Sequence, residues 1–135
     1  IERTIWRCLV KVALVSIPVQ DPVLAHAIYT KKLGFVSKEF DAEKQLAVVI
    51  SECETSGTAL LLEPCKGTFA ENYQRAAFEA NLPVIVFSVE NVDAELVRLA
   101  SLGVKLRPEL DKPEWGLMNM FEDACGNLIM LEQSF

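Results

Sequence analysis

The sequence predicts an α+β fold in which two βαβββ repeats form curved mixed sheets around a pocket. Two β-rich stretches are each followed by a capped helix that ends at a Leu-Gly pair. These pairs, Leu33-Gly34 and Leu102-Gly103, lie 69 residues apart (102 − 33), and Leu62-Glu63 and Leu131-Glu132 repeat that offset. One offset that fits both ends of the unit indicates an internal repeat.

The first repeat is expected over about residues 9–65 and begins with a β-rich strand at Leu9–Val19. Asp21 is a typical N-cap and Pro22 a typical first helical residue, and apolar residues then recur at helical spacing until Gly34 ends the helix. Three short strands are expected after this helix, at Val36–Phe40, Leu46–Ser51 and Thr58–Glu63.

A linker helix at about 69–80 is expected to join the repeats, because Phe69, Tyr73, Ala76, Ala77 and Ala80 have helical spacing. The second repeat, about 82–133, has a strand at Pro83–Val89, a capping Asn91 and a helix that ends at Gly103. Its last strands are expected at Lys105–Arg107, Leu117–Glu122 and Asn127–Gln133. Residues 1–135 are therefore predicted to form a single domain.

The strands at Leu82–Val89 and Thr58–Leu62 are apolar on both alternating faces. A sheet with one face in water does not tolerate that pattern, so both faces must be covered. Helices can cover one face. A sheet that curves around a ligand pocket satisfies the pattern on the other face.

The composition argues against several classes of function. The 135 residues carry a net charge of −6 with dispersed Lys and Arg, so no basic stripe is available for nucleic acid. The apolar stretches are too short to span a membrane, and the N-terminal residues do not resemble a signal peptide, so we expect no membrane partner and a cytoplasmic location.

Metal and nucleotide sites of the common kinds are also not expected. The four cysteines are scattered and His26 is the only histidine, so a Cys/His zinc site is not predicted. We expect reduced cysteines that act as small buried apolar residues, and His26 as an ordinary residue of a helix surface. The six glycines are too dispersed for a phosphate-binding loop, so no nucleotide cofactor is expected.

Several short motifs occur in a characteristic order along the chain. They are Ile28-Tyr29, Leu33-Gly34-Phe35, Val92-Asp93-Ala94, Trp115-Gly116, Phe121-Glu122-Asp123 and Gly126-Asn127-Leu128. With the βαβββ repeat, this order resembles the vicinal oxygen chelate superfamily, which includes glyoxalases, bleomycin-resistance proteins and extradiol dioxygenases. The resemblance covers about Lys11 to Gln133 and implies the glyoxalase-like fold.

In metal-dependent members of that superfamily, each repeat supplies one ligand from its first strand and one from its last. The resemblance carries the first-strand positions onto Leu14 and Val84, and the last-strand positions onto Met130 and onto Leu61, or Ala59 in a neighbouring register. None of these side chains is the nitrogen or hard oxygen ligand that such an ion requires. We therefore expect no metal and no other cofactor.

The residues expected to line the pocket share the strand parity of the lost ligand positions or lie in segments that could close over a ligand. The expected ligand-binding set is Leu14, Ser16, Leu61, Val84, Val86 and Met130, with Tyr73 and Arg75 of the linker helix and Trp115 of a loop. Glu63 and Glu132 occupy equivalent strand ends, where two carboxylates facing one cavity could share a proton. Solvated glutamates at the rim are the simpler interpretation, and Glu132 is the first candidate for a catalytic base.

The leading hypothesis is a homodimer that binds a small, partly apolar organic molecule without a metal, as bleomycin-resistance proteins sequester a drug. One alternative is a lyase- or dioxygenase-like enzyme, either metal-free with Glu63 or Glu132 as acid/base or metal-dependent through other ligands. A structural or regulatory partner without a pocket is a third class. The sequence alone does not name a ligand.

Overall fold

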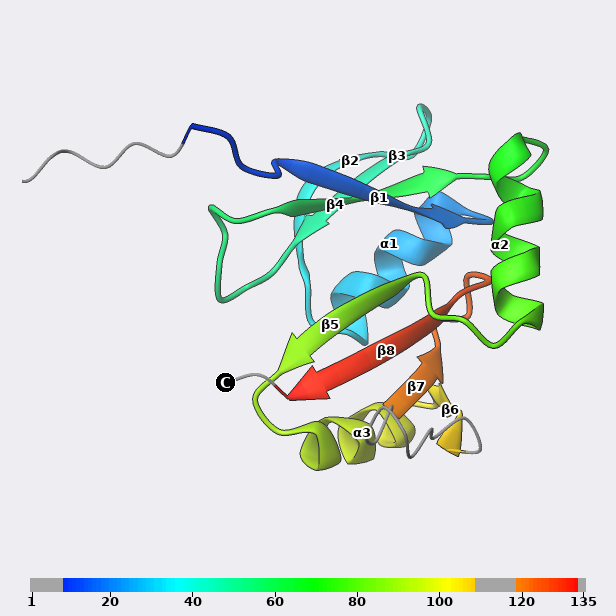
Figure 1. Ribbon diagram of the computed structural model, residues 1–135. Coiled ribbons are helices and arrows are strands. Elements are labelled where there is room, and N and C mark those ends of the chain that lie inside the picture. Colours follow the sequence, from blue (N-terminus) through cyan, green and yellow to red (C-terminus); the bar gives the residue numbers. More distant parts are fainter. Residues whose placement is uncertain (1–8, 109–118, 134–135) are drawn as a thin grey trace, which may run out of the picture.

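The computed structural model describes residues 9–108 and 119–133, in which each repeat forms one four-stranded sheet (Figure 1). The first sheet contains, in order, β1 (Leu14–Val19), β4 (Ala59–Pro64), β3 (Leu46–Ile50) and β2 (Val36–Asp41). The second contains β5 (Ile85–Val89), β8 (Leu128–Gln133), β7 (Asn119–Glu122) and β6 (Lys105–Leu106). The predicted α+β fold of two βαβββ repeats is confirmed.

Each of the helices of the described residues begins after a capping residue, and two of these caps, Asp21 and Asn91, are the ones that the sequence predicts. Asp21 accepts hydrogen bonds from the backbone N–H groups of Val23 and Leu24 at the start of α1 (Pro22–Lys31). Asn91 caps α3 (Val92–Ser101) in the same way. Thr68 caps the linker helix α2 (Phe69–Glu79). Side-chain oxygens at these positions satisfy N–H groups that a helix start leaves without partners.

The two sheets are equivalent in register as well as in strand order. β1 pairs with β4 in parallel, which places Ser16 beside Leu61. β5 pairs with β8 in parallel, which places Val86 beside Met130. The repeat therefore extends to individual side chains, and Leu61, not Ala59, is the counterpart of Met130.

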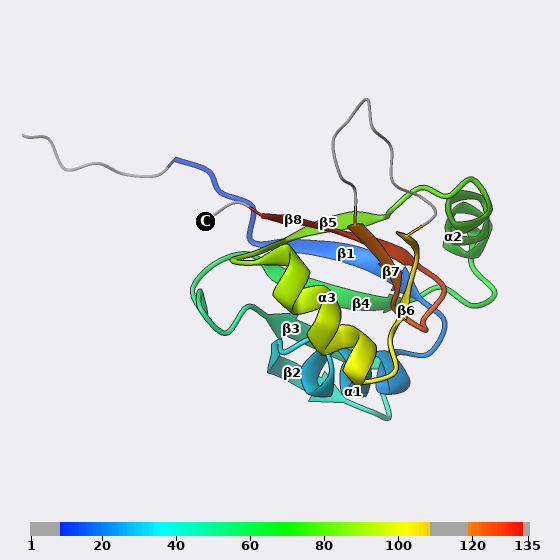
Figure 2. The ribbon, with the colours of Figure 1, turned by 90° about the horizontal axis from the view of Figure 1, so that it is seen from below.

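The inner faces of the sheets, defined as those covered by α1 and α3, form most of the core (Figure 2). Ile17 and Leu62 of the first sheet pack with α1, and Ile129 of the second packs with α3. Tyr29, Phe35 and Phe87 join the two halves, with the Phe35 and Phe87 ring centroids 5.1 Å apart. Buried aromatic pairs in such tilted arrangements add to the free energy gained by burying apolar area.

The first strand is shorter than predicted. β1 begins at Leu14, where its partner β4 begins at Ala59, and the segment before it is held to the sheet by hydrogen bonds from Ala59 N to Ala13 O and from Thr58 Oγ1 to Val12 O. Leu9 and Val10 remain more than four-fifths exposed. A strand needs a neighbour for its backbone groups, so hydrophobic sequence alone overestimated its length.

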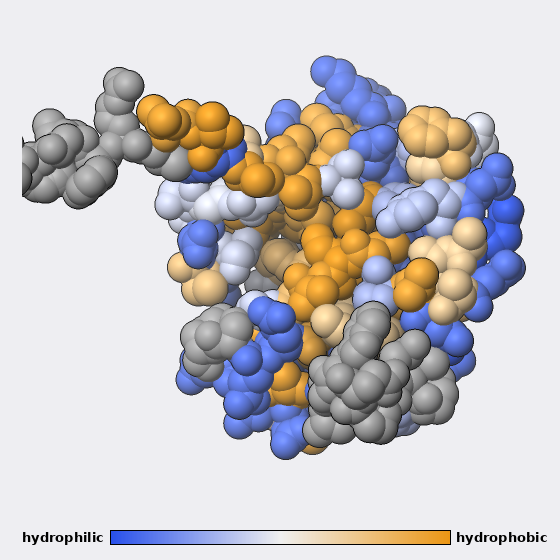
Figure 3. Space-filling model, in the orientation of Figure 1, coloured by the Kyte–Doolittle hydropathy of each residue, from blue (hydrophilic) through white to orange (hydrophobic). Residues whose placement is uncertain are grey.

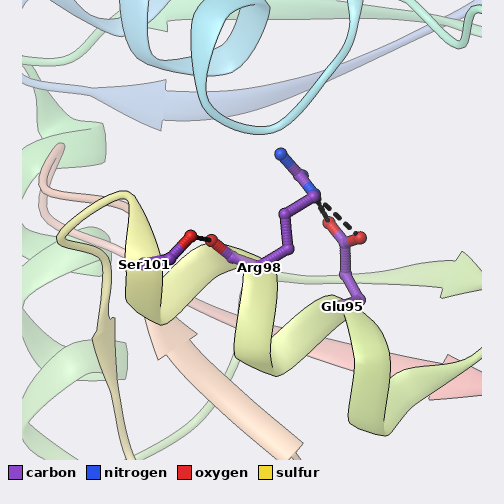
Figure 4. A network of polar contacts seen from close by, with 3 residues as sticks. All are labelled: Glu95, Arg98 and Ser101. Atoms are coloured by element: carbon purple, nitrogen blue, oxygen red, sulfur yellow. Dashed lines mark hydrogen bonds and ion pairs between the residues drawn. The ribbon is translucent and has the colours of Figure 1, made fainter.

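The exposed side of α3 carries a small network of polar contacts. Arg98 Nε donates to Glu95 Oε1 at 3.0 Å one turn earlier, and Ser101 Oγ donates to the carbonyl of Arg98 (Figure 4). Such pairs stabilise a helix by only a few tenths of a kcal/mol, roughly 0.2–0.5. Of the helices in the described ranges, none has both the length and the apolar character to cross a bilayer.

Candidate functional site

The outer faces of the two sheets, opposite α1 and α3, carry most of the residues that the sequence predicts to line a pocket. On the first sheet Ser16 and Leu61 lie beside each other, whereas the alternate residues Leu60 and Leu62 belong to the core. On the second sheet Val86 lies beside Met130, and Ile129 and Leu131 belong to the core. The alternation of strand residues thus places these residues away from α1 and α3.

These outer faces are apolar and partly open. Leu14, the first residue of the edge strand β1, is 49% exposed, and Val86 of the edge strand β5 is 42% exposed. Apolar side chains gather in the middle of the face seen in Figure 3, between β1 and β5. Val84 differs from the others, because it is partly buried and packs against core residues of both sheets.

One pocket brings three of the predicted residues together. It lies between the first sheet and α2, has a volume of about 200 Å³, and is named here the α2 pocket. Its lining residues are Ser16, Ile17, Pro18, Glu63, Phe69, Ala70 and Tyr73. The β1–β4 register places Pro18 beside Glu63, and the spacing of Phe69 and Tyr73 places both rings on one side of α2.

Other predicted residues lie elsewhere. Arg75 donates to Asn72 Oδ1 at 3.1 Å and lines a different groove on α2, with Gln74 and Phe78. Trp115 lies outside the described residues. Leu14, Leu61, Val84 and Met130 do not line the α2 pocket or the groove beside Arg75.

The two pseudo-symmetric glutamates do not face a common cavity in the described chain. Glu63 lines the α2 pocket, whereas Glu132 lines a separate hollow with Asn119 and Gln133. Ser88 Oγ also donates a hydrogen bond to Glu132 Oε2 at 3.1 Å. In Figure 1 β4 and β8 end on opposite sides of the molecule, so this arrangement does not favour a proton shared between the two carboxylates of one chain.

The side chains at the four expected metal-ligand positions do not fit a divalent ion. Leu14, Leu61 and Val84 have no donor atom beyond the backbone, and Met130 has only a soft thioether. Within residues 9–108 and 119–133, no group of three or more His, Cys, Asp or Glu side chains is arranged to hold a metal. We therefore derive no chemistry through a metal at these positions.

A buried polar network that the sequence did not predict joins α2 to both repeats. Gln74 is 3% exposed, and its Nε2 donates to the carbonyl oxygens of Pro18 on β1 and Cys125 in the β7–β8 turn, at 2.9 and 3.0 Å. Gln20 Nε2 donates to Gln74 Oε1 at 2.7 Å. Since buried amides are costly unless they are paired, this network fixes α2, and with it the wall of the α2 pocket.

Asp123 lies at the other end of this network and is 2% exposed. Its Oδ2 accepts hydrogen bonds from Tyr29 Oη at 2.6 Å and Asn127 Nδ2 at 2.9 Å, and its Oδ1 accepts from the backbone N–H groups of Cys125 and Asn127. Burial raises the pKa of the Asp123 carboxyl, and these hydrogen bonds oppose the rise. Burial also raises the pKa of the neighbouring Cys125 thiol, so this cysteine is an inert core residue.

The cysteines only partly follow the expectation of buried residues. Cys65 and Cys125 are buried, but Cys53 is exposed, and all three are free thiols. Cys8 lies outside the described residues. His26 lies on the helix surface as expected, where its ring stacks on Phe40 with centroids 4.0 Å apart and contacts Ser37 Oγ at 2.8 Å.

Comparison with known proteins identifies relatives over nearly the whole chain. The sequence model of the Glyoxalase/Bleomycin resistance protein/Dioxygenase superfamily matches residues 11–131. The Bacillus subtilis (strain 168) protein YurT is 37% identical over 125 residues, which cover 91% of this chain and 98% of that protein.

Solved structures of similar proteins include TnmS3, an antibiotic binding protein from Streptomyces sp. CB03234. It is 25% identical with a TM-score of 0.68, and the match covers 96% of this chain and 100% of that chain. The structure of UcmS2 is 27% identical with a TM-score of 0.71, and the match covers 92% of this chain and 98% of that one.

Proposed function

Because this chain belongs to the Glyoxalase/Bleomycin resistance protein/Dioxygenase superfamily, we propose that it binds a small, partly apolar organic molecule without a metal ion. The observation that carries this proposal is the apolar outer face at the positions where metal-dependent members hold their ion. The α2 pocket continues that face and adds a carboxylate and two aromatic rings. TnmS3, a similar structure, is itself described as an antibiotic binding protein.

The proposed ligand lies against Ser16 and Leu61, with Phe69 and Tyr73 as a side wall. Pockets that bind organic molecules are mainly apolar, with a few polar groups that set orientation. Phe69 is 90% exposed and Tyr73 57% exposed, so both rings are available for contact with a ligand. Binding would remove this aromatic surface from water, at roughly 25 cal/mol per Å² of apolar area.

The proposal also includes a homodimer. β1 and β5 are edge strands of their sheets, and the apolar outer faces next to them are partly open. A second copy of the chain would cover both features, since exposed edges and apolar patches favour self-association. Val86, Met130, Val84 and Leu14, which lie outside the α2 pocket, would then complete the ligand site at the subunit interface.

The dimer is tested by sedimentation of the wild type and of Val86→Lys. The wild type should have twice the 15.0 kDa chain mass. Val86→Lys places a charge on the outer face and should produce monomers. Val97→Lys is the matched control, because Val97 is 72% exposed on α3, and it should stay dimeric. A monomeric wild type would overturn this part of the proposal.

Ligand binding is tested by screening a library of small aromatic and aliphatic compounds by NMR and comparing Ser16→Phe with the wild type. Ser16 is exposed at the pocket floor, so a phenyl ring there should fill the pocket without disturbing the core. Compounds that bind the wild type should bind the variant about tenfold or more weakly, a loss of about 1.4 kcal/mol or more of binding free energy. Ser37→Phe on β2 is the control, and equal binding by all three proteins would contradict the proposed site.

An enzyme of the same superfamily is the second candidate function, and one observation favours it. Among the described residues no hydrogen bond or ion pair engages the Glu63 carboxylate, which lines an otherwise mostly apolar pocket. Glu63 is therefore a better candidate for a general base than Glu132, which Ser88 engages. Turnover of a bound compound that is lost in Glu63→Gln but kept in Glu132→Gln would favour this alternative.

A further inference from the structure

We propose that the α2 pocket selects ligands that carry a cationic group, an alkylammonium or a guanidinium, which lies between the Glu63 carboxylate and the rings of Phe69 and Tyr73. This inference rests on the proposed function and specifies its ligand class. Its support comes from the Glu63 carboxylate, from the aromatic wall of α2 and from the distribution of the protein's own cations.

The first observation is the state of the Glu63 carboxylate. Its strand partner is Pro18, whose side chain has no hydrogen-bond donor, whereas the equivalent Glu132 lies beside Ser88 and accepts a hydrogen bond from its hydroxyl group. The two repeats thus differ at this pair of positions, and of the two glutamates only Glu63 accepts no hydrogen bond from a described residue.

The second observation is the aromatic wall. Phe69 and Tyr73 are one helical turn apart on α2, line the same pocket as Glu63, and are largely exposed. The faces of such rings attract a cation when it lies within about 6 Å of the centroid. A carboxylate beside two aromatic rings favours a cationic group, repels an anion, and gives a neutral group only the contact with the rings.

The third observation is the distribution of the protein's own cations. The ion pairs of the described residues lie in the second repeat, where Arg98 pairs with Glu95, and Lys105 and Arg107 pair with Glu122. Among residues 9–108 and 119–133, no lysine or arginine lines the α2 pocket. The net charge of −6 adds a long-range attraction for cations that salt screens.

The test uses three probes of similar size: benzylammonium, benzyl alcohol and benzoate. Each is titrated into the purified full chain, and binding is followed through the backbone amide signals of β1, β4 and α2. Benzylammonium should bind about tenfold more tightly than benzyl alcohol, which is the combined effect of one exposed ion pair and one cation–π contact. Benzoate should bind most weakly.

Glu63→Gln should remove the preference for benzylammonium and leave the affinity for benzyl alcohol within about twofold, because the change removes charge and keeps shape. Glu79→Gln at the end of α2 makes the same change in net charge outside the pocket and should keep the preference. Tyr73→Leu should weaken benzylammonium binding more than benzyl alcohol binding. If Glu63→Gln keeps the preference, the carboxylate is not its source and the inference is wrong.

The other outcomes separate this inference from the proposed function. Equal binding of the ammonium and the alcohol, with shifted amide signals in the α2 pocket, would overturn the cation preference and leave the binding function supported. The absence of saturable binding by all three probes would count against the α2 pocket as a ligand site and would overturn the inference with it.

Discussion

Replacing Tyr29 by Phe should destabilise the protein by removing one buried hydrogen bond without creating a cavity. Tyr29 is fully buried, and its hydroxyl donates to Asp123 Oδ2 at 2.6 Å. A hydrogen bond to a charged group contributes about 1.5–3 kcal/mol net. Asp123 keeps three other donors, so we expect a loss near the lower end of that range, about 2 kcal/mol.

Urea unfolding followed by circular dichroism measures this loss. With a slope of about 1–3 kcal/mol per M, the midpoint should fall by roughly 1 M. Tyr73→Phe is the matched control, because the Tyr73 side chain is 57% exposed, and its midpoint should not move. Equal midpoints for Tyr29→Phe and the wild type at neutral pH would refute the view that the Asp123 network stabilises the junction of the repeats.

The pH dependence of the free energy of unfolding also reports on the hydrogen bond between Tyr29 and Asp123. Burial raises the folded-state pKa of the Asp123 carboxyl above its unfolded value, so the folded protein binds this proton more tightly than the unfolded chain does. The resulting contribution to the free energy of unfolding is fully present below the unfolded pKa. That stability is lost as the pH rises through the folded pKa. Removing the Tyr29 hydroxyl should raise the folded pKa further. The difference between Tyr29→Phe and the wild type should therefore be largest at neutral pH and shrink on acidification.

Three further predictions concern the same junction and its cysteines. Gly126→Ala should lower the unfolding free energy by about 2 kcal/mol or more in a thermal unfolding assay, since Gly126 has φ +101° and a Cβ there would lie 2.7 Å from the Gln74 amide. Gly67→Ala is the control, because Gly67 has φ +80° but a Cβ there would meet no atom within 4 Å, and it should lower the unfolding free energy by less. Gln74→Ala should cost about 1–3 kcal/mol, because buried carbonyl groups lose their donor, and an unchanged melting temperature would contradict this. In thiol labelling with peptide mapping, Cys53 should react in the native state and Cys125 only after unfolding; native labelling of Cys125 would disprove its burial.

The sequence predicted the repeat well because local signals mark its elements. Asp21 and Asn91 supply helix caps, Gly34 and Gly103 adopt positive φ after α1 and α3, and alternation assigns strand faces. These signals depend on neighbours within a few residues. They also identified Ser16, Glu63 and Tyr73, which the structure brings into one pocket.

The sequence could not predict the contacts that depend on how the two halves pack. Gln74 looks like any polar residue of an amphipathic helix, and nothing local shows that it reaches β1 and the β7–β8 turn. The motifs that contain Asp123 and Asn127 were recognised as family features, but their hydrogen bonds to Tyr29 and Pro18 span long stretches of chain. The repeat also suggested that Glu63 and Glu132 could face one cavity, whereas they line two separate hollows, because equivalent positions in a repeat need not be close in space.

The most direct test of metal-free ligand binding is calorimetric titration of one compound from the library screen into the protein before and after dialysis against EDTA. We predict the same dissociation constant in both preparations, within about twofold, because Leu14, Leu61, Val84 and Met130 offer none of the nitrogen or hard oxygen ligands that an ion would need at these positions. Affinity that disappears after EDTA and returns with nickel, zinc, iron or manganese would contradict the account.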